Sequence, residues 1–367
     1  MSATNSVVDS VIRDDIRAMT SYAIPDATGF TKLDAMENPF VLPHHLRAEL
    51  AERLAALAIN RYPAPRADAL RATIRRVMQV PLGCDVLLGN GSDELIGLIC
   101  IAAAKPEAAI LTLAPGFVMF EMAARLARVP FVAVPLKADF SLDREATLAA
   151  IRTHRPTVVF VAYPNNPTGN LFARGDVEAI IAAARQVSAL VIVDEAYRAF
   201  APDSFMPDLQ KHDNLVVLRT VSKSGLAGAR LGYLAGAPAW LAEFDKVRPP
   251  YNINVFTQSA AQFALEHHDV LDAQAANLRI ERTKLFDALQ AIEGVTPFPS
   301  AANFILLRVE SEDSEAAARV FEGLKRHRVL IKDLSRFHPL CANCLRVTVS
   351  TAEENAAFLH ALSDSLH

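Results

Sequence analysis

The sequence predicts an α/β protein: a large domain built on a mainly parallel, seven-stranded sheet covered by helices, and a smaller α+β domain. Its 367 residues exceed the size at which a single hydrophobic core usually stops growing. Between residues 85 and 236, short apolar runs alternate with amphipathic stretches, and beyond residue 237 longer helical stretches follow. Apolar strands separated by helices are typical of a parallel sheet buried on both faces.

The strands of the large domain are expected in seven apolar runs. They span residues 85–89, 108–113, 131–136, 156–164, 190–197, 214–222 and 230–236. Amphipathic stretches such as residues 176–186 predict helices between several of them. Ligands of such sheets lie at the carboxyl ends of the strands, so the residues that follow each strand are the first candidates for a site.

The C-terminal third predicts one or two long helices over residues 255–292, followed by an α+β unit. Its expected strands are residues 302–309, 328–333 and 344–350, and its expected helices are residues 314–328 and 352–366. We therefore expect a large domain over residues 41–262 and a small C-terminal domain over residues 263–367. The N-terminal segment, residues 1–40, is expected to join the small domain.

Charge and hydropathy argue against nucleic acid and membranes as partners. The net charge is −4, and Lys and Arg are spread along the chain, which leaves no basic surface for a polyanion. The N-terminus carries acidic residues where a signal peptide needs a positive flank, and the apolar runs are shorter than a membrane span. We expect a cytoplasmic protein.

No metal is expected. Cys341 and Cys344 form a CxxC pair without a second ligand pair nearby, and the pair leads into a strand rather than opening a helix. The pairs His44–His45 and His267–His268 fall in helical stretches without carboxylates at ligand spacing. Packing or surface roles are the better interpretation of all these residues.

Two motifs at strand ends have both a structural and a functional interpretation. After residues 85–89, the sequence GNGSDELIGLIC predicts a turn and a helix that Ser92 or Asp93 could cap. The exposed N–H groups at this helix start would also suit a phosphate. After residues 156–164, NNPTG predicts an ordinary turn, or a site in which Asn166 donates to the phenolic oxygen of a pyridoxal ring.

Two further strand ends carry charged groups. Asp194 follows an apolar strand, with Tyr197 three residues later. It is either part of a solvated acidic pair or the partner of a ring nitrogen, because a buried carboxylate needs a cation. In SKSGLAGAR, Ser222 and Arg230 can bind a phosphate, and Lys223 can then reach an aldehyde. A lysine near another cation has a lowered pKa and is nucleophilic.

Together, PNNPTG, DEAY and SKSGLAGARLGY, in this order, resemble the fold-type-I aminotransferases, which use pyridoxal 5′-phosphate. The resemblance runs from Tyr22 to about Ser350. Within that superfamily the chain is most similar to the histidinol-phosphate aminotransferases, on the strength of ENPF near Asn38, NRYPAP around Tyr62 and LRVTVST at Arg346.

The resemblance implies a role for each of these positions. Lys223 would form the Schiff base with the cofactor, Asp194 would pair with its ring nitrogen, and Asn166 and Tyr197 would bind its phenolic oxygen. The remaining cofactor contacts would be ring stacking by Phe117 and phosphate binding by Ser92, Asp93, Ser222 and Arg230, with Tyr62 reaching the phosphate from the other subunit of a homodimer. The substrate would be bound by Arg346, with Tyr22, Asn38 and Lys332 nearby.

The implied reaction is transfer of an amino group from histidinol phosphate to 2-oxoglutarate, which gives imidazole-acetol phosphate and glutamate in histidine biosynthesis. Two alternatives stay open on the residues alone. One is a related activity with the same cofactor, either an aromatic-amino-acid aminotransferase or an amino-acid-phosphate decarboxylase. The other is a catalytically silent protein that uses the fold for binding.

Overall fold

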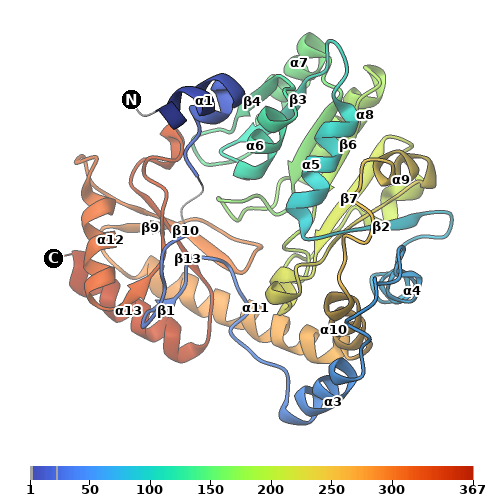
Figure 1. The fold of residues 1–367 in the computed structure, drawn as a ribbon. Helices are drawn as coiled ribbons and strands as arrows, with labels where there is room; N and C mark the ends of the chain where they lie inside the picture. Colours follow the sequence, from blue (N-terminus) through green and yellow to red (C-terminus); the bar gives the residue numbers. More distant parts are fainter. Residues whose placement is uncertain (1–2, 22–23, 367) are drawn as a thin grey trace.

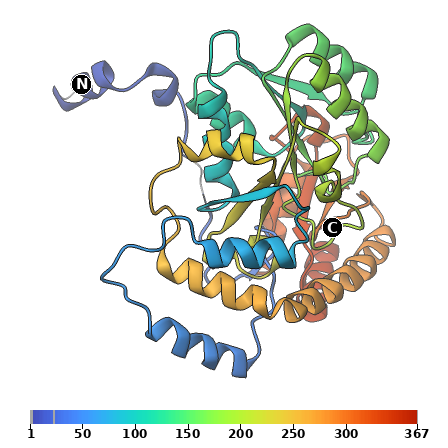
Figure 2. The ribbon, with the colours of Figure 1, turned by 90° about the vertical axis from the view of Figure 1, so that its right-hand side faces the viewer.

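The computed structural model describes residues 3–21 and 24–366. A large sheet flanked by helices forms one part of the molecule and a smaller α+β unit forms the other, with the long helix α11 (His268–Gln290) passing along both (Figure 1). Helix α1 (Ala3–Val11) projects from the body (Figure 2). The following Arg13 donates to the carbonyls of Arg125 and Leu126 at the end of a large-domain helix.

Within the described residues the large sheet has seven strands, in the spatial order β2-β8-β7-β6-β5-β3-β4. Their bounds are β2 (Asp85–Gly89), β3 (Ile110–Ala114), β4 (Phe131–Pro135), β5 (Val158–Ala162), β6 (Leu190–Asp194), β7 (Leu215–Thr220) and β8 (Gly232–Gly236). β8 is antiparallel to both of its neighbours, and the other strand pairs are parallel. The predicted mainly parallel, seven-stranded sheet is therefore confirmed.

Both faces of this sheet are buried, because successive side chains of each strand enter opposite cores. The helices of this part are α3 (His44–Ala55), α4 (Asp68–Val77), α5 (Ser92–Ala103), α6 (Val118–Leu126), α7 (Arg144–His154), α8 (Arg174–Gln186), α9 (Pro238–Asp245) and α10 (Val255–Glu266). Val159 packs in the core that contains helices α4, α7 and α8, whereas Phe160, the next residue, packs in the core of helices α5, α6 and α9. This burial explains the continuous apolar runs in the sequence.

The remaining short elements are α2 (Asp14–Arg17) and the 3-10 turns η1 (Met206–Gln210), η2 (Ser222–Ser224), η3 (Ala227–Ala229) and η4 (Pro339–Cys341). Within the described residues, no helix combines the length and the apolar character needed to cross a membrane.

The small unit is built on a four-stranded antiparallel sheet, in the order β12-β13-β10-β9. Its described elements are β9 (Val295–Pro297), β10 (Phe304–Val309), α12 (Ala316–Arg326), β11 (Val329–Leu330), β12 (Lys332–Asp333), β13 (Cys344–Thr348) and α13 (Ala352–Leu366). Residues 255–292, predicted as one or two long helices, form two, α10 and α11. The prediction of one strand over residues 328–333 is wrong: β11 pairs with β1 (Thr31–Lys32), and β12 pairs with β13.

The N-terminal segment packs on the small unit after residue 30. Its strand β1 runs parallel to β11, and Leu33 and Met36 belong to the core that also contains β10, β13 and α13. The exact domain boundaries at residues 41 and 263 stay predictions. The packing matters for function, because residues 34–38 are held beside the carboxyl ends of the large sheet.

Candidate active site

A single cavity lies at the carboxyl ends of the parallel strands, where the sequence pattern predicts it. Nine of the predicted cofactor-binding side chains line it: Ser92, Asp93, Phe117, Asn166, Asp194, Tyr197, Ser222, Lys223 and Arg230. They come from the segments after β2, β3, β5, β6 and β7 and from the loop before β8. The space between these side chains, part of it open to solvent, is about 570 Å³.

Asp194 is the last residue of β6 and is almost fully buried. One carboxylate oxygen accepts the Ala196 N–H at 3.0 Å. Burial, reinforced by the nearby Asp93 and Glu195 carboxylates, raises the pKa of Asp194 to about 7 against the opposing effect of the Ala196 hydrogen bond. The alternative of a solvated acidic pair is wrong, since Glu195 is also buried. A cation bound in the cavity would therefore strongly stabilise the ionised form of Asp194.

Lys223 lies in the turn η2, just after β7. Its Nζ donates to the Ala35 carbonyl at 3.0 Å and lies 6.0 Å from the centre of the Tyr197 ring. Burial and then the guanidinium groups of Arg346 and Arg230 lower the pKa of Lys223 to about 8. About a tenth of the amine is therefore neutral at pH 7, far more than for an ordinary lysine, as a nucleophile or general base requires.

Asn166 connects the cavity to the small unit. Its Nδ2 donates to the Tyr197 hydroxyl at 3.1 Å, and its Oδ1 accepts from Arg346 Nη1 at 2.6 Å. Arg346, on β13, also donates to the Asp34 carbonyl at 3.1 Å and lies over the Phe304 ring. The Arg346 contact fixes the direction of the amide, so that its N–H group points toward the Tyr197 hydroxyl.

The end of the cavity nearest α5 suits an anion. Gly91 is the N-cap of α5 and has a φ of +83°. A Cβ at this position would come 2.6 Å from Arg230 Nη2, so the glycine lets this guanidinium approach the helix start. The unpaired N–H groups and the dipole of the first turn add to the positive potential. Our expectation that Ser92 or Asp93 caps the helix is wrong, because both lie inside its first turn.

These groups fit pyridoxal phosphate, the cofactor that the resemblance implies. A ring nitrogen would find the carboxylate of Asp194, and a phenolic oxygen would find donors on Asn166 and Tyr197. A phosphate would suit the α5 N-terminus with Arg230. The strongest indication is Asp194: its carboxylate is almost fully buried and its pKa is raised to about 7, so a protonated ring nitrogen would supply a cationic partner that stabilises the ionised form.

Four of the predicted residues that the structure describes are not among those lining the cavity: Arg346, which reaches it through Asn166, and Asn38, Lys332 and Tyr62. Asn38 donates to Gln274 Oε1 at 2.9 Å and lines a neighbouring hollow with Ser222. Lys332 is directly across from Arg346 in the β12–β13 pair. Tyr62 stacks on Tyr251 and is 81% exposed. Tyr22 lies outside the described residues.

Sequence reasoning missed some of the lining. Thr220 ends β7 in the cavity, and its Oγ1 accepts the Ser222 N–H at 3.1 Å and donates to the Leu231 carbonyl at 3.0 Å. Thr220 thus links η2, the turn that carries Lys223 (the lysine turn), to Leu231, the residue just before β8. Its position three residues before Lys223 was a usable signal. Met36 also lines the cavity, but no local pattern distinguishes it.

In the part of the chain that the structure describes, no group of three or more His, Cys, Asp and Glu side chains is placed to hold a metal ion. Cys341 and Cys344 are buried free thiols, and burial raises the pKa of Cys341 to about 12. Such thiols are unreactive. One detail of the histidine prediction is wrong, because His268 has a carboxylate at helical spacing: its Nδ1 lies 3.0 Å from Asp272 Oδ2.

Residues 28–362 match the family Aminotransferase class I and II. The chain is 60% identical to "Histidinol-phosphate aminotransferase 1" of Ralstonia nicotianae, over 99% of this chain and 96% of that protein. It is 58% identical to the protein of the same name from Burkholderia lata, over 97% and 98% of the two chains. The structure of histidinol-phosphate aminotransferase from Sinorhizobium meliloti in complex with pyridoxal-5′-phosphate matches with a TM-score of 0.86 at 24% identity, over 97% of this chain and 98% of that one, and supports the fold alone. The chain therefore belongs to the class I and II aminotransferases and, within them, to the histidinol-phosphate aminotransferase family.

Proposed function

We propose that this protein transfers the amino group of L-histidinol phosphate to 2-oxoglutarate, with pyridoxal 5′-phosphate as cofactor. The observation that carries the proposal is the meeting of Lys223, Asp194 and Arg230 around one cavity. The names of relatives that are 60% and 58% identical over nearly the whole chain support the substrate. A reducing compartment suits the four free cysteines, so the proposal includes a cytoplasmic location.

In this proposal the bound cofactor supplies an aldehyde and an electron-withdrawing ring, and the chain's own residues supply charge and proton transfer. Lys223 Nζ would take the proton from the substrate carbon that bears the amino group, as a base, and deliver it to the carbon that the cofactor supplies as its aldehyde, as an acid. Asp194 keeps a positive charge on the ring nitrogen. Asn166 and the Tyr197 hydroxyl stabilise negative charge on the phenolic oxygen.

We propose that Arg346 and Lys332 bind the second substrate, 2-oxoglutarate, and the phosphate of histidinol phosphate. They face one another across neighbouring strands, and cross-strand partners point to the same side of a sheet. The two cations suit the phosphate of histidinol phosphate in one half-reaction and a carboxylate of 2-oxoglutarate in the other. Lys332 carries the charge without the bidentate fork of an arginine.

A donor panel tests the substrate. With 2-oxoglutarate as acceptor, kcat/KM for histidinol phosphate is expected to exceed that for histidinol, phenylalanine and tyrosine by at least about 100-fold, because two charge-assisted contacts to a phosphate are lost with the other donors. Steady-state assays of the four donors measure this. A preference below about tenfold, or about 1.4 kcal/mol, would contradict phosphate recognition and favour a broad aromatic aminotransferase.

The same proposal includes a homodimer in which Tyr62 reaches the cofactor phosphate of the neighbouring subunit. Tyr62 lies outside the cavity of its own chain and is largely exposed. It stacks on Tyr251 at 4.6 Å, and Ile59 and Phe256 are also exposed large apolar side chains. Exposed aromatic and apolar side chains of this kind mark interaction surfaces.

Mixed dimers test the shared site. Tyr62→Ala and Lys223→Ala homodimers are both expected to be weakly active or inactive. In a mixed dimer, one of the two sites has both Lys223 and Tyr62 intact, so co-expression with two different tags should restore about half of the wild-type activity per dimer. Kinetics and sedimentation of the doubly purified species measure this. A mixed dimer as inactive as its parents would exclude a contribution of Tyr62 across the interface.

A further inference from the structure

A buried ion pair lies directly behind the proposed cofactor carboxylate. Glu195 follows Asp194, and its side chain is completely buried. Its Oε2 accepts from both Nε and Nη2 of Arg219, at 2.9 and 2.8 Å. Arg219 is itself buried and lies on β7, next to Thr220 of the cavity. A guanidinium held in this way neutralises the Glu195 carboxylate.

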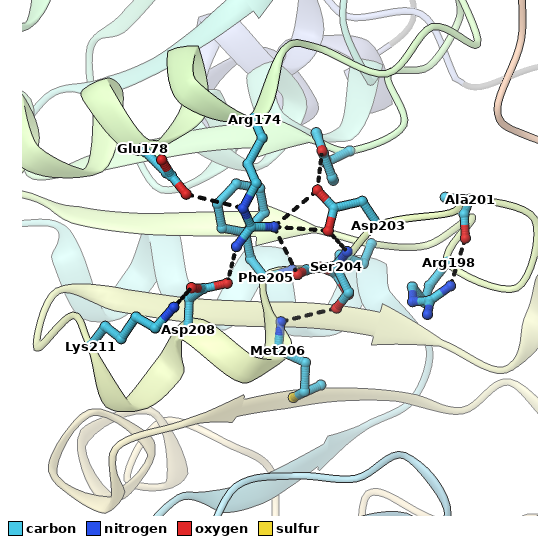
Figure 3. A network of polar contacts seen from close by, with 12 residues as sticks. Arg174, Glu178, Arg198, Ala201, Asp203, Ser204, Phe205, Met206, Asp208 and Lys211 are labelled. Atoms are coloured by element: carbon cyan, nitrogen blue, oxygen red, sulfur yellow. Dashed lines mark hydrogen bonds and ion pairs between the residues drawn. The ribbon is translucent and has the colours of Figure 1, made fainter.

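The loop between β6 and η1 completes the coordination of Glu195. Ser204 Oγ donates to Glu195 Oε2 at 2.9 Å, and the Phe205 N–H donates to the other oxygen. This loop is held from α8 by Arg174, which binds Asp203 Oδ1 at 2.8 Å and the Ser204 carbonyl at 3.2 Å (Figure 3). The Met206 N–H also donates to Ser204 Oγ (Figure 3). The groups that donate to Glu195 are therefore held in place by contacts of their own.

Asp194, Glu195 and Arg219 come from the adjacent ends of β6 and β7. Side chains of neighbouring residues point to opposite faces, so Asp194 lines the cavity while Glu195 and Arg219 lie behind it. The charged groups that act on Asp194 are Glu195 beside it, Asp93 on α5 and Lys223 on η2. Of these, Glu195 is the one whose charge is balanced by a buried arginine, Arg219.

We propose that Arg219 and Glu195 form a positioning pair for transamination: Arg219 balances the charge of Glu195 and thereby keeps Asp194 ionised for the cofactor ring. Neither residue touches the cavity space assigned to the cofactor, so both act through Asp194. The pair also joins the ends of β6 and β7, which carry Asp194 and the lysine turn. This inference rests on the proposed role of Asp194.

The test measures the affinity for pyridoxal phosphate as a function of pH in three variants: Arg219→Met, Glu195→Gln and the double variant. Pyridoxal phosphate is added to the apoprotein, and its visible absorbance reports binding. Arg219→Met leaves a negative charge beside Asp194, which raises the pKa of Asp194. The acid limb of the affinity profile should move up by about one pH unit, with about tenfold weaker binding on that limb. Glu195→Gln leaves the positive charge of Arg219, which lowers the pKa of Asp194, so the acid limb should move to lower pH. The double variant should return close to wild type.

Opposite shifts that cancel in the double variant are the signature of charge, because loss of structure would weaken binding in both single variants. Arg174→Met serves as the structural control: it should lower the melting temperature without moving the acid limb. If Arg219→Met does not fold, Glu195→Gln and the double variant still show the direction in which the acid limb moves. Limbs that stay in place, or move in the same direction, would overturn the inference. If Asp194→Asn also left cofactor affinity unchanged, the proposed function of Asp194 would fail instead.

Discussion

Replacing Lys223 with alanine is expected to reduce kcat by on the order of 10⁴-fold, because the amine is the general base and acid of the proposed reaction. Its position supports this role: Lys223 Nζ lies in the cavity with Asp194, and burial together with the Arg346 and Arg230 guanidinium groups lowers its pKa to about 8. Steady-state kinetics with histidinol phosphate and the visible spectrum of the purified protein measure the change. The absorbance of lysine-linked cofactor should disappear.

Two controls make this result specific. Lys246→Ala removes an exposed lysine that contacts Glu243 on α9 and should leave both the spectrum and kcat unchanged. Lys223→Arg keeps a positive charge but cannot deprotonate, so it should be as inactive as the alanine variant. A yellow and active Lys223→Ala protein would show that another amine holds the cofactor.

Replacing Asp194 with asparagine is expected to weaken cofactor binding by on the order of 100-fold, since losing one partner of a buried ion pair costs about 3 kcal/mol. The effect should depend on pH. Burial and the neighbouring Asp93 and Glu195 carboxylates raise the pKa of Asp194 to about 7 in the cofactor-free protein. Only the ionised carboxylate pairs with a protonated ring nitrogen, so wild-type affinity should fall about tenfold for each pH unit below 7.

Equilibrium titration of the apoprotein with pyridoxal phosphate between pH 5 and pH 9 measures both effects. The asparagine variant should lose the part of the acid limb that Asp194 causes, while titration of the cofactor's own groups remains in both proteins. Parallel affinity profiles for the two proteins would mean that Asp194 does not titrate in this range, and equal affinities would remove it from the site.

Local sequence determined the large sheet and most of the cavity. The strands at residues 85–89, 190–194 and 232–236 could be predicted because burial on both faces demands unbroken apolar runs. The carboxyl ends of parallel strands meet at one edge, so the residues after each strand converge whatever the details of packing. For this reason Asn166, Asp194 and Lys223, which are far apart in the chain, were predictable as neighbours.

Only the tertiary structure decided what surrounds these residues. The hydrogen bond from Arg346 to Asn166 joins positions 180 residues apart, and the Glu195–Arg219 pair lies on the far side of two adjacent strands. Residues 328–333, which were predicted as one strand, divide between two sheets because the N-terminal segment pairs with the first half. Apolar periodicity records which face of an element is buried. It carries no information on which distant polar group satisfies a buried charge, and that partner is fixed only when the elements pack.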